Sequence, residues 1–313
     1  MLTMESGNTF YFAWEVTVQE WLQHIIASDI GIKIASLMTM LGEEIILIAV
    51  LGFLYWSYDK EFGRYVGNNI LVALVVTPML KNVFFRRRPY FDHQDIQILK
   101  PVDASADLYD ISAQGYSFPS GHSTNAASLY GSMAAYRKKN KALLAIGILI
   151  PFFVGVSRVM LGAHYVTDVL AGWLVGLCTI VVFSFLQSCI KNENLLHLIV
   201  ALLCLTGFFY CKTTDYYTGY GMMIGYYLAV PFEKRFVNFK TTDNLVKRIL
   251  RVIGGGAIYF GLNALLKLPF SEELLSSPTT PAFLLRTVRY AIIVFVLIGV
   301  YPLLFDRFPK PRK

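Results

Sequence analysis

Residues 81–89 read KNVFFRRRP, residues 119–122 read PSGH, and residues 157–168 read SRVMLGAHYVTD. Each stretch lies where a long apolar run begins or ends. If these runs form packed helices, the three polar stretches at their ends are expected to meet in one site. Together the stretches supply three cations spaced for one anion, a helix start suited to phosphate, and two histidines. We therefore expect a phosphate-handling site at the edge of a membrane, and the rest of the chain to position that site.

The first and third stretches supply the positive charge. A phosphoryl group in its transition state spreads negative charge over its oxygens, so catalysis needs fixed cations around it. Lys81 and Arg88 are seven residues apart, two helical turns, and can point the same way. Arg158 would arrive from another span, and arginine donors match phosphate oxygens in pairs. A basic cluster that only contacts lipid headgroups is the alternative, and it fits Arg86 and Arg87.

The second stretch predicts a helix start that binds an anion. Proline suits the first turn of a helix, and the free amides there, with the helix dipole, attract negative charge. Gly121 lets the backbone approach the anion closely, and Ser120 adds a hydroxyl. His122 is placed at the mouth of such a site to protonate a leaving oxygen.

The third stretch predicts a nucleophile. His164 and Asp168 are four residues apart and share a face if the helix begins early enough. A carboxylate that holds one imidazole nitrogen fixes the tautomer and leaves the other nitrogen free to attack. Each short motif is common by chance, so the prediction depends on their joint presence.

Composition indicates a membrane protein. The chain has 313 residues, of which 55% are hydrophobic and 16% charged, against about 25% charged in soluble domains. Mean hydropathy is +0.51, and several runs almost without charge reach the length that crosses a bilayer. The net charge of +7 lies mostly in short loops between these runs, so we expect no nucleic-acid partner.

The apolar pattern predicts an all-α fold, a polytopic membrane helix bundle of about nine spans. Gly221 and Gly225 are spaced for close approach of a neighbouring helix. The expected spans are 34–57, 65–85, 120–136, 142–161, 167–189, 193–210, 216–232, 249–267 and 282–305.

The N-terminal segment, 1–33, is expected to form an interfacial helix over residues 10–28. Apolar residues that include Trp14 and Trp21 fall on one face, and polar residues that include Glu15 and Gln19 fall on the other. This pattern suits a helix in the plane of the membrane surface, with tryptophans at headgroup level.

Two features of the expected spans and loops have open interpretations. Glu43 and Glu44 lie inside the first expected span, where an acid is costly; either they have a function or they are wet or ion-paired near its end. The long loop 90–118 is typical of a lid or binding loop. The four cysteines lack metal spacing and are expected to pack in the core; they are Cys178, Cys189, Cys204 and Cys211.

Charge bias predicts the orientation. With the N-terminus outside and nine spans, the inner loops hold 17 of the 28 basic residues. The positive-inside rule therefore predicts an extracytoplasmic N-terminus and a cytoplasmic C-terminus. All three motif stretches then fall on the extracytoplasmic side of a cell membrane.

The three stretches resemble the type 2 phosphatidic acid phosphatase superfamily, whose motifs read K-x6-R-P, P-S-G-H and S-R-x5-H-x3-D. Every fixed position is matched, in order. They are Lys81, Arg88, Pro89, Pro119, Ser120, Gly121, His122, Ser157, Arg158, His164 and Asp168. The resemblance covers residues 34–190 and implies a six-helix phosphatase core, with 191–313 as a C-terminal transmembrane extension.

The resemblance also implies roles. His164 would be the nucleophile and form a phosphohistidine, Asp168 would orient it, and His122 would be the acid and then the base. The phosphate would be held by Lys81, Arg88, Ser120, Gly121 and Arg158. Neither a metal nor another cofactor is implied.

The leading hypothesis is a membrane phosphatase acting on a lipid phosphate or polyprenyl diphosphate at the outer face. A lipid or sugar phosphotransferase using the same covalent step is an alternative. A catalytically inactive transport or binding protein is another, for which Glu43 and Glu44 are the only support. The sequence leaves the oligomeric state open.

Overall fold

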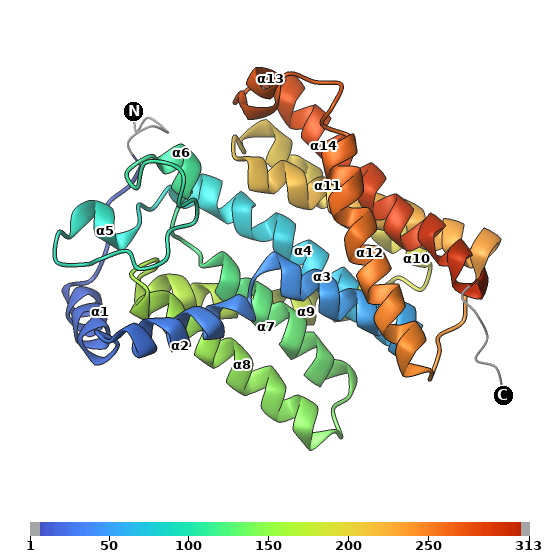
Figure 1. The fold of residues 1–313 in the computed structure, drawn as a ribbon, viewed down its shortest axis with the longest axis horizontal. Coiled ribbons are helices and arrows are strands. Elements are labelled where there is room, and N and C mark those ends of the chain that lie inside the picture. Colours follow the sequence, from blue (N-terminus) through green and yellow to red (C-terminus); the bar gives the residue numbers. More distant parts are fainter. Residues whose placement is uncertain (1–6, 308–313) are drawn as a thin grey trace. The chain divides into compact units, whose positions relative to one another are not determined.

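The computed structural model describes residues 7–307. It is helical for 76% of the chain, with no strand among the described residues, so the expected all-α fold is confirmed (Figure 1). The chain divides into two compact units. One contains the described residues up to 47 together with 76–182, and the other contains 48–75 together with those from 183 onward. Three helices contribute residues to both units; they are α3 (Glu44–Phe53), α4 (Lys60–Phe84) and α9 (Val166–Cys189).

The first unit contains the three motif stretches. Polar side chains begin its helices: Asn140 caps α8 by accepting from the amides of Ala142 and Leu143, and Ser28 caps α2 by accepting from Gly31. Besides its parts of α3, α4 and α9, the unit has α1 (Ala13–Ile25), α2 (Asp29–Met40), α5 (Pro89–Asp92), α6 (Ile111–Gln114), α7 (Gly121–Tyr136) and α8 (Lys141–Met160).

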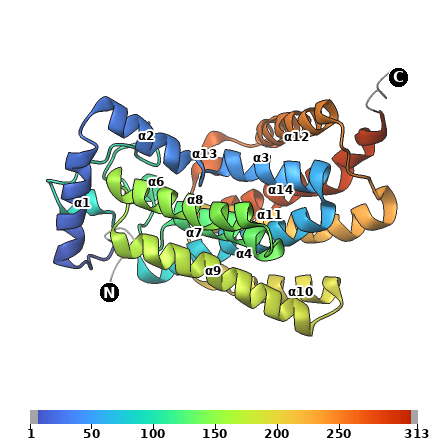
Figure 2. The same ribbon diagram turned by 90° about the horizontal axis from the view of Figure 1, so that it is seen from below.

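Helices α7, α8 and α9 pack side by side through small residues (Figure 2). A Cβ at Gly172 of α9 would lie 2.7 Å from the carbonyl oxygen of Ser120, and one at Gly176 would lie 2.8 Å from that of Thr124. The two glycines therefore allow α9 to approach the start of α7 at backbone distance. This packing brings the second and third motif stretches together.

The first expected span, 34–57, is not one straight helix. It divides into α2 and α3, which continues as a π-helical turn over Leu54–Tyr58, and the two parts are bent by 46°. The break falls at Gly42, where a Cβ would lie 2.9 Å from the carbonyl oxygen of His122. Glycine is a poor helix former, and its lack of a Cβ allows the close approach of the His122 backbone at the break.

Glu43 and Glu44 follow this break. Glu43 forms an ion pair with Lys100 of the long loop, at 2.6 Å between Oε1 and Nζ, with both side chains partly exposed. Glu44 is the first residue of α3, where a negative charge is favourable beside the helix dipole. Glu43 therefore fits the interpretation in which the carboxylate is solvated and ion-paired near the end of the span.

The second unit is built around the packing of α11 on α14. A Cβ at Gly221 would lie 2.4 Å from the Thr287 carbonyl oxygen, and one at Gly225 would lie 2.3 Å from that of Ala291, so the expected close approach is confirmed. The unit contains α10 (Glu193–Leu205), α11 (Thr214–Phe232), α12 (Leu245–Leu265), α13 (Glu272–Ser276) and α14 (Thr280–Phe295).

The expectation that all four cysteines pack in the core is wrong for two of them. Cys204 and Cys211 are buried, whereas Cys178 and Cys189 of α9 are exposed, and all four are free thiols. Both exposed cysteines lie in an apolar helix long enough to span a bilayer. A lipid-facing thiol matches the sequence pattern of a core thiol, because both are surrounded by apolar residues.

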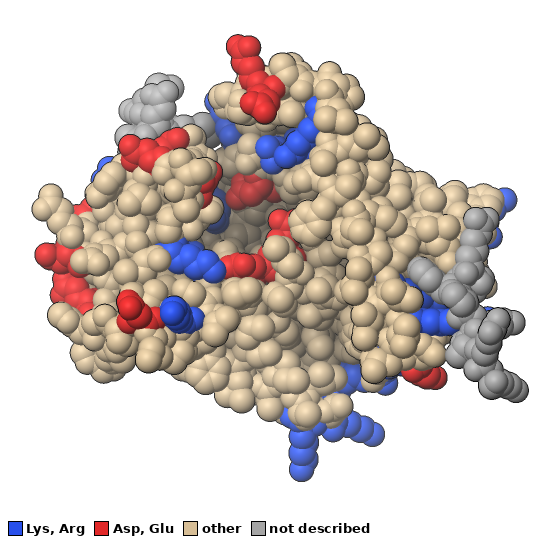
Figure 3. Space-filling view, in the orientation of Figure 1, with Lys and Arg blue, Asp and Glu red and all other residues tan. Residues whose placement is uncertain are grey.

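Among residues 7–307, four helices are long and apolar enough to cross a membrane, or five if the bent pair is one span. They are Lys60–Phe84, Lys141–Met160, Val166–Cys189 and Thr280–Phe305. Helices also form at the other expected ranges, but the count of about nine spans is not confirmed. Wide areas of the surface lack charged side chains, and Lys and Arg gather at the exposed α7–α8 connection, residues 137–141 (Figure 3).

Candidate active site

The motif PSGH starts α7, as predicted, but Pro119 lies just before the N-cap and outside the first turn, because the helix begins at Gly121. Ser120 is the N-cap: its Oγ accepts from the Ser123 hydroxyl at 2.9 Å and, at 3.5 Å, from the Ser123 amide. The Ser120 amide donates to the Asp168 carbonyl oxygen at 2.9 Å, which ties α7 to α9. Apart from its chain neighbours and the backbone of its own helix, no described atom lies within 4 Å of the position of a Cβ on Gly121. Space is therefore open beside the first residue of α7, at the helix end where an anion is favoured.

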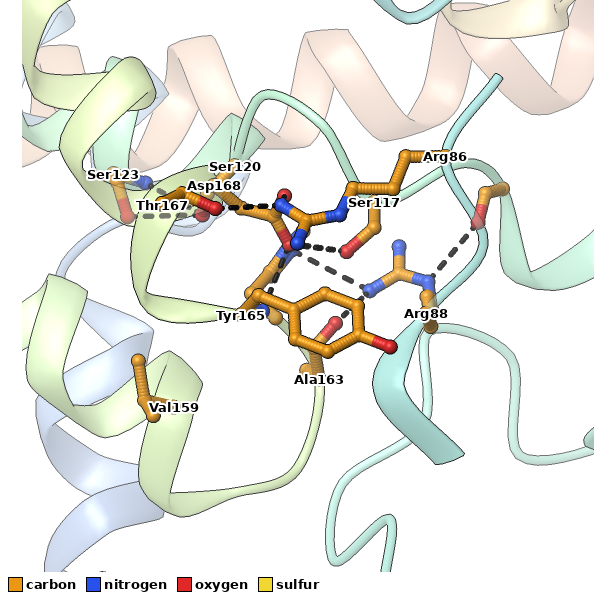
Figure 4. A network of polar contacts seen from close by, with 12 residues as sticks. Arg86, Arg88, Ser117, Ser120, Ser123, Val159, Ala163, Tyr165, Thr167 and Asp168 are labelled. Carbon is orange, nitrogen blue, oxygen red and sulfur yellow. Dashed lines mark hydrogen bonds and ion pairs between the residues drawn. The ribbon is translucent and has the colours of Figure 1, made fainter. Parts of the chain in front are cut away.

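Arg88 follows α4 and precedes α5, and backbone carbonyls fix its side chain. Its Nε donates to the carbonyl oxygens of Gln114 and Gly115 at 2.9 and 3.0 Å, and Nη1 donates to that of Ala163 at 2.9 Å (Figure 4). The guanidinium is buried, with Nη1 3.4 Å from His164 Nε2. Arg88 thus places a rigid cation next to the predicted nucleophile and ties down the end of the long loop.

Arg158 reaches the same region from the end of α8. It is buried, and its Nη1 donates to Thr39 Oγ1 of α2 at 3.1 Å. The charges of Arg88, Arg158 and Lys81 all act on both His164 and His122. The expected gathering of three cations and two histidines is therefore present in the first unit.

His164 lies just before α9, which begins at Val166. Burial lowers the pKa of its imidazole well below the ordinary value of 6.5, and the positive charges of Arg88, Arg158 and Lys81 lower the pKa further. The imidazole is consequently neutral at physiological pH. Its Nε2 faces Arg88, and its Nδ1 faces away from that cation toward Ser117 and Asp168.

The contact between His164 and Asp168 is less direct than the sequence predicts. Nδ1 lies 3.5 Å from Asp168 Oδ2, which is long for a hydrogen bond, whereas Ser117 Oγ lies 3.2 Å from Nδ1. The Ser117 hydroxyl donates to Asp168 Oδ2, which also accepts from the Tyr165 amide at 2.8 Å. Ser117 therefore bridges the two predicted residues. The position of Ser117 is fixed by its backbone amide, which donates to the Arg86 carbonyl oxygen at 2.7 Å.

Several residues of this site are absent from the sequence prediction. Arg86, assigned there to lipid headgroups, is fully buried, and its Nη1 donates to Asp168 Oδ1 at 2.7 Å. Glu15 and Gln19, on the polar face of the N-terminal helix, are buried against the site. The available signal was their i, i+4 spacing on the polar face of the helix, opposite the aromatic face. A polar face can contact buried polar groups of the protein as well as water.

Two family comparisons extend this geometry to known proteins. Residues 62–190 match the PAP2 superfamily, and residues 217–312 match the transmembrane extension of PAP2 superfamily phosphatases. Phosphatidylglycerophosphatase B of Bacillus subtilis is 43% identical over 173 residues, 51% of this chain and 72% of that protein. The chain therefore belongs to the PAP2 superfamily, which confirms the resemblance found in its motifs.

More distant relatives share the same region. An undecaprenyl-diphosphatase of Sulfolobus acidocaldarius is 27% identical over 43% of this chain and 60% of that protein. A lipid A 1-phosphatase of Rhizobium etli is 30% identical over 38% of this chain and 47% of that protein. The crystal structure of a transmembrane PAP2-type phosphatidylglycerolphosphate phosphatase from Bacillus subtilis is 25% identical, with a TM-score of 0.44, over 58% of this chain and 90% of that one.

Proposed function

We propose that this chain is an integral-membrane phosphatase that hydrolyses a lipid phosphate or diphosphate through a phosphohistidine on His164. The observation that carries the proposal is the environment of His164. Its Nε2 lies 3.4 Å from the Arg88 guanidinium, and its Nδ1 lies 3.2 Å from Ser117 Oγ. A neutral imidazole that is held on one side and faces a buried cation on the other is suited to attack a bound phosphoryl group.

In the first step, Lys81, Arg88 and Arg158 hold the phosphoryl oxygens with the Ser120 hydroxyl and the Gly121 amide. His164 Nε2 attacks phosphorus. The bond from phosphorus to the alcohol oxygen breaks, and His122, which the bound phosphate anion keeps protonated against the neighbouring cations, gives that oxygen its proton. The covalent product is a phosphohistidine, whose positive ring is stabilised through Ser117 by the Asp168 carboxylate.

In the second step, His122, now neutral, takes a proton from water. The water oxygen attacks phosphorus, the phosphorus–nitrogen bond breaks, and inorganic phosphate leaves with His164 restored. Arginine and lysine side chains here supply the positive charge that a metal ion supplies in other phosphoryl-transfer enzymes. We therefore propose that the reaction needs no metal.

The substrate class follows from the site's membrane setting and from the relatives. The named relatives act on phosphatidylglycerophosphate, undecaprenyl diphosphate and lipid A. These lipids share an anionic phosphate head on an apolar tail, and we propose the same chemistry for this chain's substrate. Charge bias in the loops supports a site on the extracytoplasmic face of the cell membrane.

Phosphate release in detergent with a chelator present tests the proposal. The panel would contain phosphatidylglycerophosphate, phosphatidic acid, undecaprenyl diphosphate and glucose 6-phosphate, each measured beside His164→Ala. We expect metal-free release from at least one lipid and none from the variant.

Two outcomes would contradict the proposal. Release only from the sugar phosphate would contradict a lipid substrate, and release abolished by the chelator but restored by a divalent cation would contradict metal independence. Mass spectrometry of the products separates hydrolysis from transfer, because a phosphotransferase yields a new phosphorylated acceptor.

A further inference from the structure

Arg86 lies in a buried charge network that the reaction steps above do not use. Its Nη1 donates to Asp168 Oδ1 and to Thr167 Oγ1, both at 2.7 Å. Its Nη2 donates to Glu15 Oε2 at 3.0 Å. The Tyr165 ring lies beside the guanidinium, 4.0 Å from its central carbon to the ring centroid (Figure 4). Arg86 thus joins a carboxylate from the N-terminal helix to the carboxylate behind the nucleophile.

Glu15 is held as firmly as Arg86. Its Oε1 accepts from the Thr167 amide at 2.8 Å and from the Thr167 hydroxyl at 2.7 Å. Its Oε2 accepts from Arg86 and from the Phe12 amide, the latter at 2.9 Å. Both Glu15 and Arg86 have no exposed surface. A buried carboxylate is tolerated when donors surround it in this way, and removal of one partner leaves an uncompensated charge.

The helix that carries Glu15 supports the nucleophile a second time. Gln19, one turn further along α1, donates from Nε2 to the carbonyl oxygens of Val159 and His164, at 3.1 and 3.4 Å. On the opposite face, Trp14 and Trp21 are exposed. One face of α1 therefore contacts the active site, while the other presents aromatic side chains suited to a membrane interface.

We propose that Glu15 and Arg86 are positioning residues that hold the Asp168 carboxylate in the one orientation that serves His164. Arg86 anchors Oδ1, which turns Oδ2 toward Ser117 and, through it, toward His164 Nδ1. Glu15 fixes Arg86 and, through Thr167, the first turn of α9. The inference rests on the proposed function, because it gives residues that do not touch the substrate a part in that reaction.

A double-mutant cycle on the full chain tests this. Glu15→Gln keeps the shape of the side chain and removes its charge, and we expect it to lower kcat about tenfold, with KM changed less than about twofold. In an Asp168→Asn background the same change should lower kcat by less than about twofold, because the residue it acts through is already altered. Arg86→Lys replaces the two nitrogens that bond Asp168 and Glu15 separately with a single ammonium group, and it should behave in the same way.

Matched controls are available beside both residues. Arg87 also pairs with a carboxylate, Asp92, but its pair is partly exposed and lies outside the network. Glu20 follows on the same helix, and no hydrogen bond or ion pair among the described residues joins it to the site residues named above. Arg87→Lys and Glu20→Gln should therefore leave kcat within about twofold of the unmodified protein.

If Glu15→Gln lowered kcat by the same factor with and without Asp168→Asn, the inference would be overturned, because the loss would then indicate less folded protein. A measurement that needs no turnover distinguishes failure of this inference from failure of the proposed function. The ¹⁵N resonance of His164 Nδ1, assigned by its loss in His164→Ala, should shift in Glu15→Gln and stay in place in Glu20→Gln. No shift in Glu15→Gln would also overturn the inference, whether or not any lipid is hydrolysed.

Discussion

Ser117 is the residue on which the pairing of His164 and Asp168 depends. It stands 3.2 Å from the imidazole Nδ1 and donates to the carboxylate, while the two partners are themselves 3.5 Å apart. A bridging hydroxyl fixes the tautomer in the way a directly bonded carboxylate would, because its oxygen accepts a hydrogen bond from Nδ1–H while its own hydrogen bonds to the carboxylate. The tautomer with Nδ1 protonated leaves Nε2 free for phosphorus.

We expect Ser117→Ala to lower kcat roughly tenfold to hundredfold, the size of effect seen when the partner behind a ligating histidine is removed. The substrate should bind nearly as well, because the three cations remain. Steady-state phosphate release measures both quantities. Ser132→Ala is the matched control: Ser132 is another buried serine of the unit, bonded only to the Leu129 carbonyl oxygen among the contacts of the described residues. A Ser117→Ala enzyme with unchanged kcat would contradict the bridging role.

The lowered pKa of His164 predicts the acidic side of the pH profile. The neutral imidazole is the nucleophile, so protonation inactivates it, and a pKa below 6.5 moves that protonation to lower pH. The kcat/KM of the free enzyme should therefore stay near its maximum as pH falls to 6.5 and decline only below it. The second ionisation of the substrate phosphate also falls near this pH, so the profile is corrected for it, and the remaining decline reports the enzyme group. A decline centred at or above pH 6.5 would contradict the burial of His164 among cations.

The sequence predicted the residues that we propose to hold phosphate better than the residues that support them. Lys81, Arg88, Arg158 and the two histidines have chemistry that identifies them by type and spacing, and the structure brings them together. Arg86 is adjacent to residues of the same type, so sequence alone did not distinguish a buried ion pair from a headgroup contact. Its role depends on Glu15, 71 residues away along the chain.

At the scale of elements, backbone-to-backbone packing sets which helices are neighbours. Gly172 and Gly176 allow α9 to reach α7, and Gly221 and Gly225 allow α11 to reach α14. A side chain at any of these positions would meet a carbonyl oxygen, which cannot move aside as a flexible side chain can. The spacing of small residues in the sequence is therefore a good predictor of contact, as it was for Gly221 and Gly225.

Gly225→Ala should destabilise the second unit, because the new Cβ would lie 2.3 Å from the Ala291 carbonyl oxygen. We expect a loss of about 1–3 kcal/mol in the free energy of unfolding, as for other overpacked positions. Thermal unfolding in detergent measures it. Gly256→Ala of α12 is the control, since no atom lies within 4 Å of its Cβ position; it should be neutral or stabilising by about 0.5–1 kcal/mol. Equal midpoints for the two variants would contradict the close α11–α14 contact.

The break between α2 and α3 shows what a hydropathy pattern misses. Residues 34–57 are apolar enough to be counted as one span, yet α2 and α3 are bent by 46°. Gly42 lies at the break, where the backbone of His122, 80 positions away in the sequence, approaches too closely for a Cβ. A hydropathy pattern shows which residues avoid water. It does not show which residues distant in the sequence they contact.

For the whole molecule, orientation in the membrane is the property that charge predicts. The loop at 137–141 is exposed and basic, and the motif stretches are expected on the opposite side of the bilayer. Fold class and family were predictable because they depend on composition and on motifs of fixed spacing. The number of crossings was not, since helices such as α7 and α10 are shorter or less apolar than a free-standing span requires.

Cysteine labelling in intact cells tests the orientation. In a background with Cys178 and Cys189 replaced by serine, Ser105→Cys in the long loop should react with a membrane-impermeant maleimide. Lys139→Cys, in the basic loop, should react only after the membrane is permeabilised. Both positions are exposed in the structure, so accessibility reports the side of the membrane. The reverse pattern would place the site on the cytoplasmic face.

The central claim is the covalent step on His164, and trapping the intermediate tests it most directly. A lipid phosphate carrying ³²P would be mixed with the purified protein and quenched in alkali, where a phosphohistidine survives. The label should appear on the peptide that contains His164, disappear on acid treatment, and be absent from His164→Ala. His122→Ala lacks both the acid of the first step and the base of the second, so in that variant the label should accumulate only from a substrate whose leaving group needs no proton, such as a p-nitrophenyl phosphate. Full turnover of the substrate with no label on the protein would contradict the account.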